Sequence, residues 1–383
     1  MRTSTATLLL VLVTAPAQAQ LTIRLRDLPA ATPAGATIYV AGTFNMWNPA
    51  APAYALAADS GGALHITLPA TVRGPIEFKF TLGSWETVET NSSGGDLANR
   101  SFTIPDSGAA VYRSTVAGWK QPGSAPVVRA HTARPGVRVL SDSFAMPQLD
   151  RARRVWIYLP ADYARSRKRY PVLYMHDGQN VFDIATSYVG EWGVDETLDS
   201  LHAQVIVVAV DHGAQHRLDE YNPWRNARYG GGEGAAYVEF LVKTLKPYID
   251  AHYRTQPDRA HTAIAGSSMG GLISLYAALK YPEVFGKAGV FSPSLWIAPE
   301  IVSLAHDAKL GVRPRLYFVS AGNETRDQGQ IAVSGPLMRE LVSRGYVSGR
   351  DLVSIIREDG AHSEWFWRRE FPAAYQWLFA KRP

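Results

Sequence analysis

One short segment of the sequence has the residue types and the spacing of a serine nucleophile. Residues 266–271 read Gly-Ser-Ser-Met-Gly-Gly, which fits the pattern Gly-x-Ser-x-Gly around Ser268. An apolar run, 263–265, precedes the segment, and a helix-forming run, 272–281, follows it. A strand, a sharp turn and a helix in this order lift a serine hydroxyl above a sheet, and only small side chains fit beside so tight a turn. The alternative is a small-residue connection in which Ser267 or Ser268 caps the helix.

A serine hydroxyl is a good nucleophile only when an imidazole takes its proton and a carboxylate orients that imidazole. Of the ten histidines, only His306 and His362 follow Ser268 in the chain. His306 lies in a polar helical stretch and is expected at the surface. His362 lies in a loop between the strand expected at 352–357 and the last helix. Because the chain order in such sites is serine, acid, histidine, His362 is predicted to be the base.

The acid is expected in the loop that follows the strand at 315–320, and this loop holds two carboxylates, Glu324 and Asp327. Glu324 is nearer the end of the strand, from which a side chain can reach back across the sheet edge. Asp327 is placed to cap the helix that begins near Gln328. We therefore favour Glu324 as the third catalytic residue and keep Asp327 as the alternative.

The charge that develops on an attacked carbonyl oxygen requires N–H donors. The N–H of Met269 is one candidate, because it opens the helix that follows the nucleophile. A second donor is expected from the loop after the strand at 172–175. Gly178 permits close approach of the backbone there, so the N–H of Gly178 or of Gln179 is the second candidate.

The sequence contains no cysteine, which excludes disulfides, thiolate metal sites, iron–sulfur clusters and cysteine nucleophiles. His176 and Asp177 precede Gly178 and could form a second acid–base pair or bind a metal. No further His or carboxylate recurs at metal-ligand spacing, so these two residues are expected to shape the loop. We predict neither a metal nor a cofactor.

Two patterns of elements divide the chain. Residues 20–118 form short strand-like runs separated by Pro, Gly, Asn and Asp, as in a small all-β, immunoglobulin-like sandwich. Residues 119–136 are typical of a linker. Over 137–383, apolar strand runs alternate with amphipathic segments, of which 235–252 and 272–281 are the clearest helices. With the serine turn, this alternation predicts an α/β-hydrolase fold, a mostly parallel sheet with helices on both faces.

Residues 1–19 have the composition of a secretory signal peptide. Arg2 is followed by an apolar run, 8–13, and by an Ala-x-Ala end, with the expected cut after Ala19. The run is much shorter than the ~20 residues that cross a bilayer, and no cysteine follows it for attachment of a lipid. We expect a secreted or periplasmic protein without a membrane span.

Composition and charge exclude several classes of protein. Hydrophobic residues make up 46% of the 383 residues and charged residues 19%, which is ordinary for a globular protein and excludes a mostly disordered or coiled-coil chain. The net charge is +5, but the basic residues are scattered and no aromatic platform accompanies them. No nucleic-acid partner is therefore predicted.

Several segments resemble a known family. They are residues 171–180, 191–196, 217–221, 266–271 and 291–296. Over about 137–383, the chain resembles the esterase D / enterochelin-esterase-like family of α/β-hydrolases. The resemblance implies acyl-ester chemistry without a cofactor, as in siderophore, feruloyl and acetyl-xylan esterases, formylglutathione hydrolases and mycolyl transferases. Trp192, Tyr221 and Trp296 are candidates for an acyl or sugar pocket, and plain packing is the other interpretation.

The N-terminal region has a resemblance of its own. Through the segments 38–48 and 78–85, residues 36–104 resemble an early-set β-sandwich of the starch- and glycogen-binding type. The resemblance implies that Trp47 and Trp85 could offer apolar faces to pyranose rings of a polysaccharide. The alternative is a spacer, or part of the active-site wall, in which Trp47 is structural.

Together these features predict a secreted or periplasmic serine carboxylic-ester hydrolase that forms an acyl-enzyme. The expected substrates are small-molecule or glycan-linked esters, either siderophore-like or carbohydrate-linked feruloyl or acetyl esters. Two other functions remain open. One is an acyltransferase that uses the same triad with a sugar or lipid acceptor. The other is a carbohydrate-binding protein with an inactive hydrolase domain, which the intact Ser268 and His362 argue against.

Overall fold

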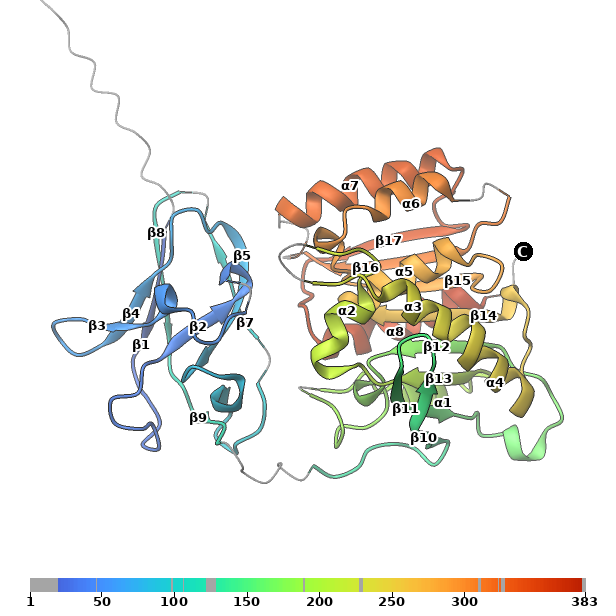
Figure 1. Cartoon of the computed structure of the whole chain (residues 1–383), viewed down its shortest axis with the longest axis horizontal. Coiled ribbons are helices and arrows are strands. Elements are labelled where there is room, and N and C mark those ends of the chain that lie inside the picture. Colours follow the sequence, from blue (N-terminus) through green and yellow to red (C-terminus); the bar gives the residue numbers. More distant parts are fainter. Residues whose placement is uncertain are drawn as a thin grey trace, which may run out of the picture. The chain divides into compact units, whose positions relative to one another are not determined.

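The computed structural model describes residues 20–380, apart from residues 46, 98, 106, 122–128, 189, 227–229, 309–310, 323 and 325–327. The predicted signal peptide, residues 1–19, lies outside the described residues. The chain divides into two compact units (Figure 1). Unit 1 comprises Met1–Gly95 and Asn99–Ser124, and unit 2 comprises Asp96–Ala98 and Ala125–Pro383.

Unit 1 consists of short strands. In its described part, one sheet has the order β3 (Ala57–Ala58), β4 (Leu64–Thr67), β1 (Gln20–Leu25) and β8 (Ala109–Ser114). A second sheet has the order β2 (Tyr39–Gly42), β5 (Gly74–Thr81) and β7 (Arg100–Ile104). A ribbon pairs β6 (Glu89–Thr90) with β9 (Gly118–Trp119). These pairs are antiparallel, except that β1 runs parallel to β8.

One hydrophobic core is shared by the two larger sheets of unit 1. Burial alternates along β1, so that Leu21, Ile23 and Leu25 all enter this core. Phe78 and Phe80 of β5 enter it from the other sheet, with their rings edge to face and their centroids 5.7 Å apart. The described part of unit 1 is thus β-rich, with two sheets packed on one core.

Unit 2 is built on one large sheet of eight described strands. Their order is β10 (Val137–Met146), β11 (Arg151–Tyr158), β13 (Ile206–Val210), β12 (Val172–His176), β14 (Thr262–Ser267), β15 (Lys287–Phe291), β16 (Arg315–Ala321) and β17 (Leu352–Arg357). The pairs that involve β10 or β11 are antiparallel, and the strands from β13 to β17 are parallel. The carboxyl ends of the parallel strands therefore meet at one edge, where ligands of such sheets usually bind.

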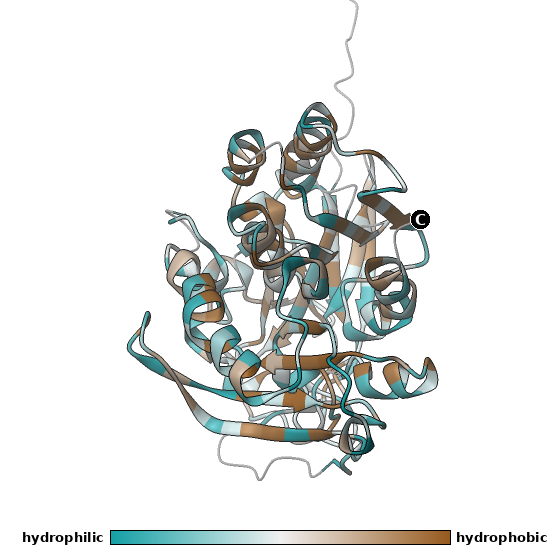
Figure 2. Ribbon diagram, turned by 90° about the vertical axis from the view of Figure 1, so that its right-hand side faces the viewer, coloured by the Kyte–Doolittle hydropathy of each residue, from teal (hydrophilic) through white to brown (hydrophobic). Residues whose placement is uncertain are grey.

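Helices cover both faces of this sheet. One face packs against α2 (Arg217–Tyr221), α3 (Gly234–Phe240), α4 (Lys246–His252), α5 (Met269–Lys280), α6 (Ile301–Asp307) and α7 (Gln328–Ser343). The other face packs against α1 (Val194–Ser200) and α8 (Glu364–Phe379). Figure 2 shows apolar residues concentrated on the central strands and polar residues frequent on the helices around them. The predicted α/β-hydrolase fold is confirmed. No helix in the described ranges is both long and apolar enough to cross a membrane.

The segment 235–252, predicted as one helix, is continuous but not uniform. It runs from α3 through a π-helical turn, Leu241–Leu245, into α4. Pro247 stands in the first turn of α4 and has no N–H to donate to the preceding turn. The wider π turn lies directly before this proline, where a regular α-helical hydrogen bond would be missing.

Residues at both ends of the segment 119–136, predicted from composition to be a linker, have contacts within the units. At one end, Trp119 is buried in the core of unit 1. At the other end, Thr132 Oγ1 donates to Glu191 Oε2 at 2.7 Å and Arg134 N donates to Asp195 Oδ2 at 2.7 Å, so these residues belong to unit 2. Residues 122–128, in the middle of the segment, lie outside the described residues.

Candidate active site

Ser268 stands at the carboxyl end of β14, at the turn into α5. Its backbone has φ 57° and ψ −122°, a conformation that residues with a side chain rarely adopt. Its N–H donates to Phe291 O at 2.9 Å, which ties the turn to the neighbouring strand β15. A Cβ atom on Gly266 would lie 2.8 Å from the carbonyl carbon and oxygen of Gly270, so this tight turn requires glycine. The local structure is the strand, sharp turn and helix that the sequence predicts.

The hydroxyl of Ser268 has a partner that sequence reasoning missed. Ser294 Oγ lies 3.1 Å from Ser268 Oγ, and Ser294 N donates to Ser268 O at 3.1 Å. Ser294 follows β15 in a short loop that begins at Ser292, whose φ is 42°. A side-chain and a main-chain bond from one residue thus hold Ser268 from the side of β15. The sequence signal for this contact between Ser268 and Ser294 is the Ser-Pro-Ser run at 292–294, which directly follows an apolar strand.

His362 and Glu324, predicted as base and acid, are brought together. The distance between His362 Nδ1 and Glu324 Oε1 is 2.6 Å. The other carboxylate oxygen, Glu324 Oε2, accepts the N–H of Ala321 at 2.8 Å, which fixes the carboxylate to the end of β16. Asp327, the alternative acid, lies outside the described residues. His306 is exposed and contacts Glu340 on the surface, 3.0 Å away.

An aromatic cluster supports the imidazole of His362. The ring of Trp367 meets it edge to face, with centroids 5.2 Å apart, and Trp367 Nε1 donates to Ser292 Oγ at 3.0 Å. Trp192 packs behind Trp367, with centroids 5.8 Å apart, and against Phe291 of β15 at 4.9 Å. The loop of His362 is therefore braced against the strand next to the nucleophile strand.

The predicted second oxyanion donors lie in residues 177–180, which we call the oxyanion loop. Asp177 opens it with φ 55° and ψ 49°, and a short 3-10 turn, Gly178–Asn180, follows. A Cβ atom on Gly178 would lie 2.9 Å from Asp211 Oδ1 and from the backbone of Val210, so only glycine fits against β13. The side-chain nitrogen of Gln179 is buried without a hydrogen-bond partner among the described residues. A substrate oxygen would satisfy this group.

His176 and Asp177 have structural partners, in keeping with the predicted role in shaping the loop. Burial lowers the pKa of His176 to about 4, so its imidazole is neutral at pH 7, and its Nδ1 lies 2.9 Å from the hydroxyl of Tyr237. Asp177 accepts Arg217 Nε at 2.7 Å and Arg217 Nη2 at 2.9 Å. Burial alone would raise the pKa of Asp177, but the Arg217 guanidinium holds it below its usual range. Within the described residues, no group of His, Asp and Glu side chains could hold a metal ion.

The three aromatic candidates for substrate contact have different surroundings. Trp296, in the loop that also carries Ser294, has 41% of its surface exposed. Trp192 is 4% exposed and Tyr221 is fully buried, so both support the site from behind. Glu364, at the start of α8 next to the His362 loop, was not predicted. Burial raises the pKa of its carboxyl, and the nearby charges are those of His362, Asp177 and Arg217.

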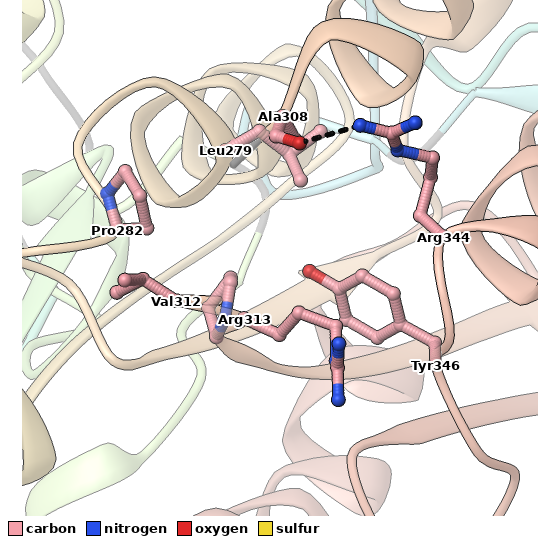
Figure 3. A pocket seen from close by; sticks show the side chains of 8 residues that line it. Leu279, Pro282, Ala308, Val312, Arg313, Arg344 and Tyr346 are labelled. Carbon is pink, nitrogen blue, oxygen red and sulfur yellow. Dashed lines mark hydrogen bonds between the residues drawn. The ribbon is translucent and has the colours of Figure 1, made fainter. Parts of the chain in front are cut away.

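A pocket between α5, α6 and α7 lies away from this site (Figure 3). It is lined by Leu279 and Pro282 at the end of α5, and by Val312, Arg344 and Tyr346. Arg344 Nη2 donates to the carbonyl oxygen of Ala308 at 3.0 Å. Pro282 precedes β15, Val312 precedes β16, and Arg344 and Tyr346 precede β17, so the pocket is at the amino edge of the sheet. The candidate active site is at the carboxyl edge.

The geometry at the carboxyl edge suits acyl transfer. A serine in a strained turn, an imidazole bonded to a carboxylate, and backbone N–H groups at the start of α5 and in the oxyanion loop are the parts that such a reaction requires. The described residues of these parts all come from unit 2.

Comparison with known proteins identifies the family. The family model Esterase, described as "Putative esterase", matches residues 146–378, which is more than half of the chain. YbbA of Bacillus subtilis, an uncharacterized protein, is 27% identical over 242 residues, covering 60% of this chain and 93% of YbbA. The ferri-bacillibactin esterase BesA of B. subtilis is 27% identical over 217 residues, covering 51% of this chain and 70% of BesA. An alpha-amylase of Niallia circulans is 47% identical over 94 residues, covering 24% of this chain but only 7% of the amylase.

Solved structures agree with the fold. The ferric enterobactin esterase of Salmonella typhimurium matches with a TM-score of 0.54 and 19% identity, covering 90% of this chain and 88% of that one. A ferulic acid esterase matches with a TM-score of 0.50 and 19% identity, covering 63% of this chain and 98% of that one. Both likenesses concern the fold alone. With the family match over 146–378, they lead to one conclusion: the chain belongs to the Esterase family and is a carboxylic ester hydrolase of the α/β-hydrolase fold.

Proposed function

We propose that this ester hydrolase works through a Ser268–His362–Glu324 triad and a covalent acyl-enzyme. The observation that carries the proposal is the 2.6 Å contact between Glu324 and the Nδ1 atom of His362, at the sheet edge where Ser268 occupies its strained turn. Nδ1–H bonded to the carboxylate leaves Nε2 as the basic atom of the imidazole. His362 takes the Ser268 proton as Ser268 Oγ attacks the ester carbonyl, and returns it to the leaving alcohol. It then activates water to release the acid.

The developing oxyanion is assigned to the N–H of Met269 and to the N–H of Gly178 or Gln179. Met269 is the first residue of α5, so its N–H has no acceptor within the helix. Removing one such donor typically lowers kcat by about 10²- to 10³-fold. Trp296, exposed in the loop of Ser294, is the aromatic side chain that we assign to substrate contact.

The nucleophile is tested with Ser268→Ala and p-nitrophenyl acetate. We expect hydrolysis to fall to background while circular dichroism stays that of the native protein, and a fluorophosphonate probe to label the native chain at Ser268 only. Ser343→Ala, on the exposed end of α7, is the matched control and should keep native turnover. An active Ser268→Ala variant would show that another residue is the nucleophile.

The substrate is proposed to be a siderophore-like ester or a feruloyl or acetyl ester linked to carbohydrate. BesA is named for a ferric siderophore, and the ferulic acid esterase for a ferulate ester. A panel of a ferric catecholate trilactone, methyl ferulate, acetylated xylan and short p-nitrophenyl esters tests the class. We expect kcat/KM for one of the first three to exceed that for p-nitrophenyl acetate. A preference for the short p-nitrophenyl esters alone would count against both classes.

A second function, polysaccharide binding, is proposed for unit 1. The rings of Trp47 and Trp85 are 6.2 Å apart and tilted by 43°, and Trp85 is 39% exposed. Trp47 has a φ of 58°, a backbone conformation that residues with a side chain rarely adopt and that occurs often at functional sites. The match to an alpha-amylase, 47% identical over 94 residues, supports the same proposal. Retardation in gels that contain amylopectin or xylan should be lost in Trp85→Ala and kept in Trp365→Ala, an exposed tryptophan of unit 2. If the native protein migrates in both polysaccharide gels as it does in a gel without polysaccharide, polysaccharide binding by unit 1 is excluded.

We also propose export and removal of residues 1–19. The support is the sequence pattern described above, since these residues lie outside the described part of the chain. Mass spectrometry of the secreted or periplasmic protein should give a mature chain that begins at Gln20. Recovery of the uncut chain from the cytoplasm would contradict this.

A further inference from the structure

We infer that Arg217 is a positioning residue, which holds the oxyanion loop against the nucleophile helix α5 through the carboxylate of Asp177. The inference rests on the proposed serine mechanism, because the loop matters for turnover only if it supplies an oxyanion donor. Arg217 does not act on the substrate in this role. It sets the spacing between two elements that each carry one donor.

The first observation is that two residues of α2 bind Asp177 of the oxyanion loop. Arg217 Nε and Nη2 bind the two carboxylate oxygens of Asp177 at 2.7 and 2.9 Å, so the side chain is fixed in direction as well as distance. Tyr221, one helical turn further along α2, accepts the N–H of Asp177 through its hydroxyl oxygen at 3.2 Å. The guanidinium of Arg217 also lies over the Tyr221 ring, 5.2 Å from its centroid. Two residues of one helix face thus hold both the main chain and the side chain of Asp177.

The second observation is that the same carboxylate also reaches α5. A Cβ atom on Gly270 would lie 3.2 Å from Asp177 Oδ2 and 3.3 Å from the Cβ of His176. The carboxylate therefore sits against the first turn of α5, at the positive end of the helix dipole. Met269, in that turn, and Gly178, the neighbour of Asp177, carry the proposed donors. One ion pair consequently touches both elements that must face the same oxygen.

The third observation is that other contacts hold α2, the helix that carries Arg217, in place. Arg151 Nη1 donates to the buried Glu220 at 2.9 Å, and Arg153 contacts the same carboxylate. Asp219 accepts the N–H of Gly231 at 2.8 Å. Asp177 itself has a left-handed backbone, with φ 55°, which the surrounding contacts must maintain. Loss of the Arg217 contact would release that strain at the residue that leads into Gly178.

The test begins with Arg217→Lys, which keeps the positive charge but lacks the planar fork that binds two oxygens. We expect kcat for p-nitrophenyl acetate to fall about 10- to 100-fold while KM changes less than about twofold, because misplaced donors weaken transition-state stabilisation. The second-order rate of fluorophosphonate labelling at Ser268 should fall by the same factor. That reaction also places negative charge on an oxygen held by these donors.

A double-mutant cycle separates this role from general loss of packing. Asp177→Asn and Arg217→Met should each reduce kcat, and the double variant should lose no more than the worse single one. The matched control is Arg350→Lys. Arg350 also binds one aspartate through two nitrogens, with Nε and Nη2 3.2 and 2.9 Å from Asp351 Oδ2, but at the amino edge of the sheet. It should keep native kcat and labelling rate.

Two results would overturn the inference. Native kcat and labelling rate in Arg217→Lys would show that the ion pair does not set the donor geometry. An increase in KM with kcat unchanged would show that Arg217 binds the substrate. If Arg217→Met fails to fold, as judged by its urea midpoint, Arg217→Lys and Asp177→Asn decide the matter. Failure of the proposed function is distinct, because the native chain itself would then not be labelled at Ser268.

Discussion

The two carboxylate oxygens of Glu324 have different partners. One lies 2.6 Å from His362 Nδ1, and the other accepts the N–H of Ala321 at the end of β16. A carboxylate accepts at both oxygens, whereas an amide has one acceptor and one donor group. Glutamine at this position could serve Ala321 or His362 as an acceptor, but not both. The orientation and the tautomer of His362 therefore depend on the charge of one side chain.

Glu324→Gln is expected to lower kcat by about 10²- to 10⁴-fold, by analogy with removal of the triad carboxylate in other serine hydrolases. KM for p-nitrophenyl acetate should stay within about threefold, because Glu324 does not contact the substrate in the proposed mechanism. Steady-state kinetics at pH 7.5 measure both constants. The same measurement on Asp327→Asn decides between the two carboxylates, and a larger loss there would assign the acid to Asp327.

At the scale of single residues, the sequence predicted what a motif or chain order dictates. Ser268 follows from its glycine spacing, and His362 from its place after the last strand. It favoured Glu324 over Asp327 only because Glu324 is nearer the end of the strand, since two carboxylates in one loop are of the same chemical type. Tyr221 was a candidate for the pocket, with plain packing as the alternative, and it is fully buried; aromatic type alone does not reveal which face of an element is covered.

At the scale of elements, α1 carries a buried carboxyl group whose hydrogen-bond donor is a backbone N–H. Asp195, in its first turn, is fully buried and accepts the N–H of Arg134 at 2.7 Å, while its other oxygen has no hydrogen-bond partner among the described residues. Burial raises the pKa of Asp195 to about 7, and the neighbouring Glu196 acts in the same direction. The folded protein thus favours the neutral carboxyl in a range of pH where the unfolded chain is ionised.

Asp195→Asn is expected to become progressively more stable than the native chain as pH rises from 5 to 8. A carboxyl whose folded pKa is raised favours folding fully below its ordinary value near 4, and this contribution is lost as pH rises through about 7. The asparagine variant has no such loss and keeps an oxygen for Arg134. Free energies of unfolding in urea at several pH values measure the difference.

The control for this prediction is Asp142→Asn, an exposed carboxylate paired with Arg154. It should show no widening difference from the native chain between pH 5 and 8. If the difference in free energy of unfolding between Asp195→Asn and the native chain does not change with pH, Asp195 is ionised in the folded protein over the whole range from pH 5 to 8.

The fold was predictable to the level of elements and less so within them. The alternation of apolar strands with amphipathic segments predicted the parallel sheet, because strands that are buried on both faces must be apolar along their whole length. The π turn between α3 and α4 was not anticipated, because the hydrophobic periodicity of 235–252 is helical on both sides of it. Only Pro247 indicates where the regular helix is interrupted. Contacts at the end of the predicted linker were not anticipated, because hydrogen bonds of Thr132 and Arg134 to buried acids leave no trace in composition.

At the scale of the whole molecule, each unit has hydrophobic cores of its own. Leu21, Val40 and Phe78 belong to the core of unit 1, while the clusters on the two faces of the large sheet belong to unit 2. The described catalytic candidates all lie in unit 2. Stability of unit 1 and turnover by unit 2 should therefore be separable by mutation.

Phe78→Ala is expected to destabilise unit 1 by about 3–5 kcal/mol, the usual range for a buried phenylalanine. Phe78 is fully buried and its ring contacts those of Phe80 and Tyr112, 5.7 and 5.2 Å away. Calorimetry should show one transition moved to lower temperature and another unchanged, with kcat for p-nitrophenyl acetate native at 25 °C. A parallel loss of turnover would mean that the esterase unit depends on a folded unit 1.

The order of strands in the large sheet also bears on how the protein is made. From β14 to β17 the strands are laid down outward in the order of the sequence, and α8 then packs back across β15 and β16 with Trp367 against His362. On a ribosome, Ser268, the proposed nucleophile, thus emerges well before the proposed acid and base. At about 5–20 residues per second, a nascent chain spends several seconds with Ser268 synthesised and Glu324 and His362 still to come. If the proposed triad is correct, ester hydrolysis is acquired only near the end of translation of this unit.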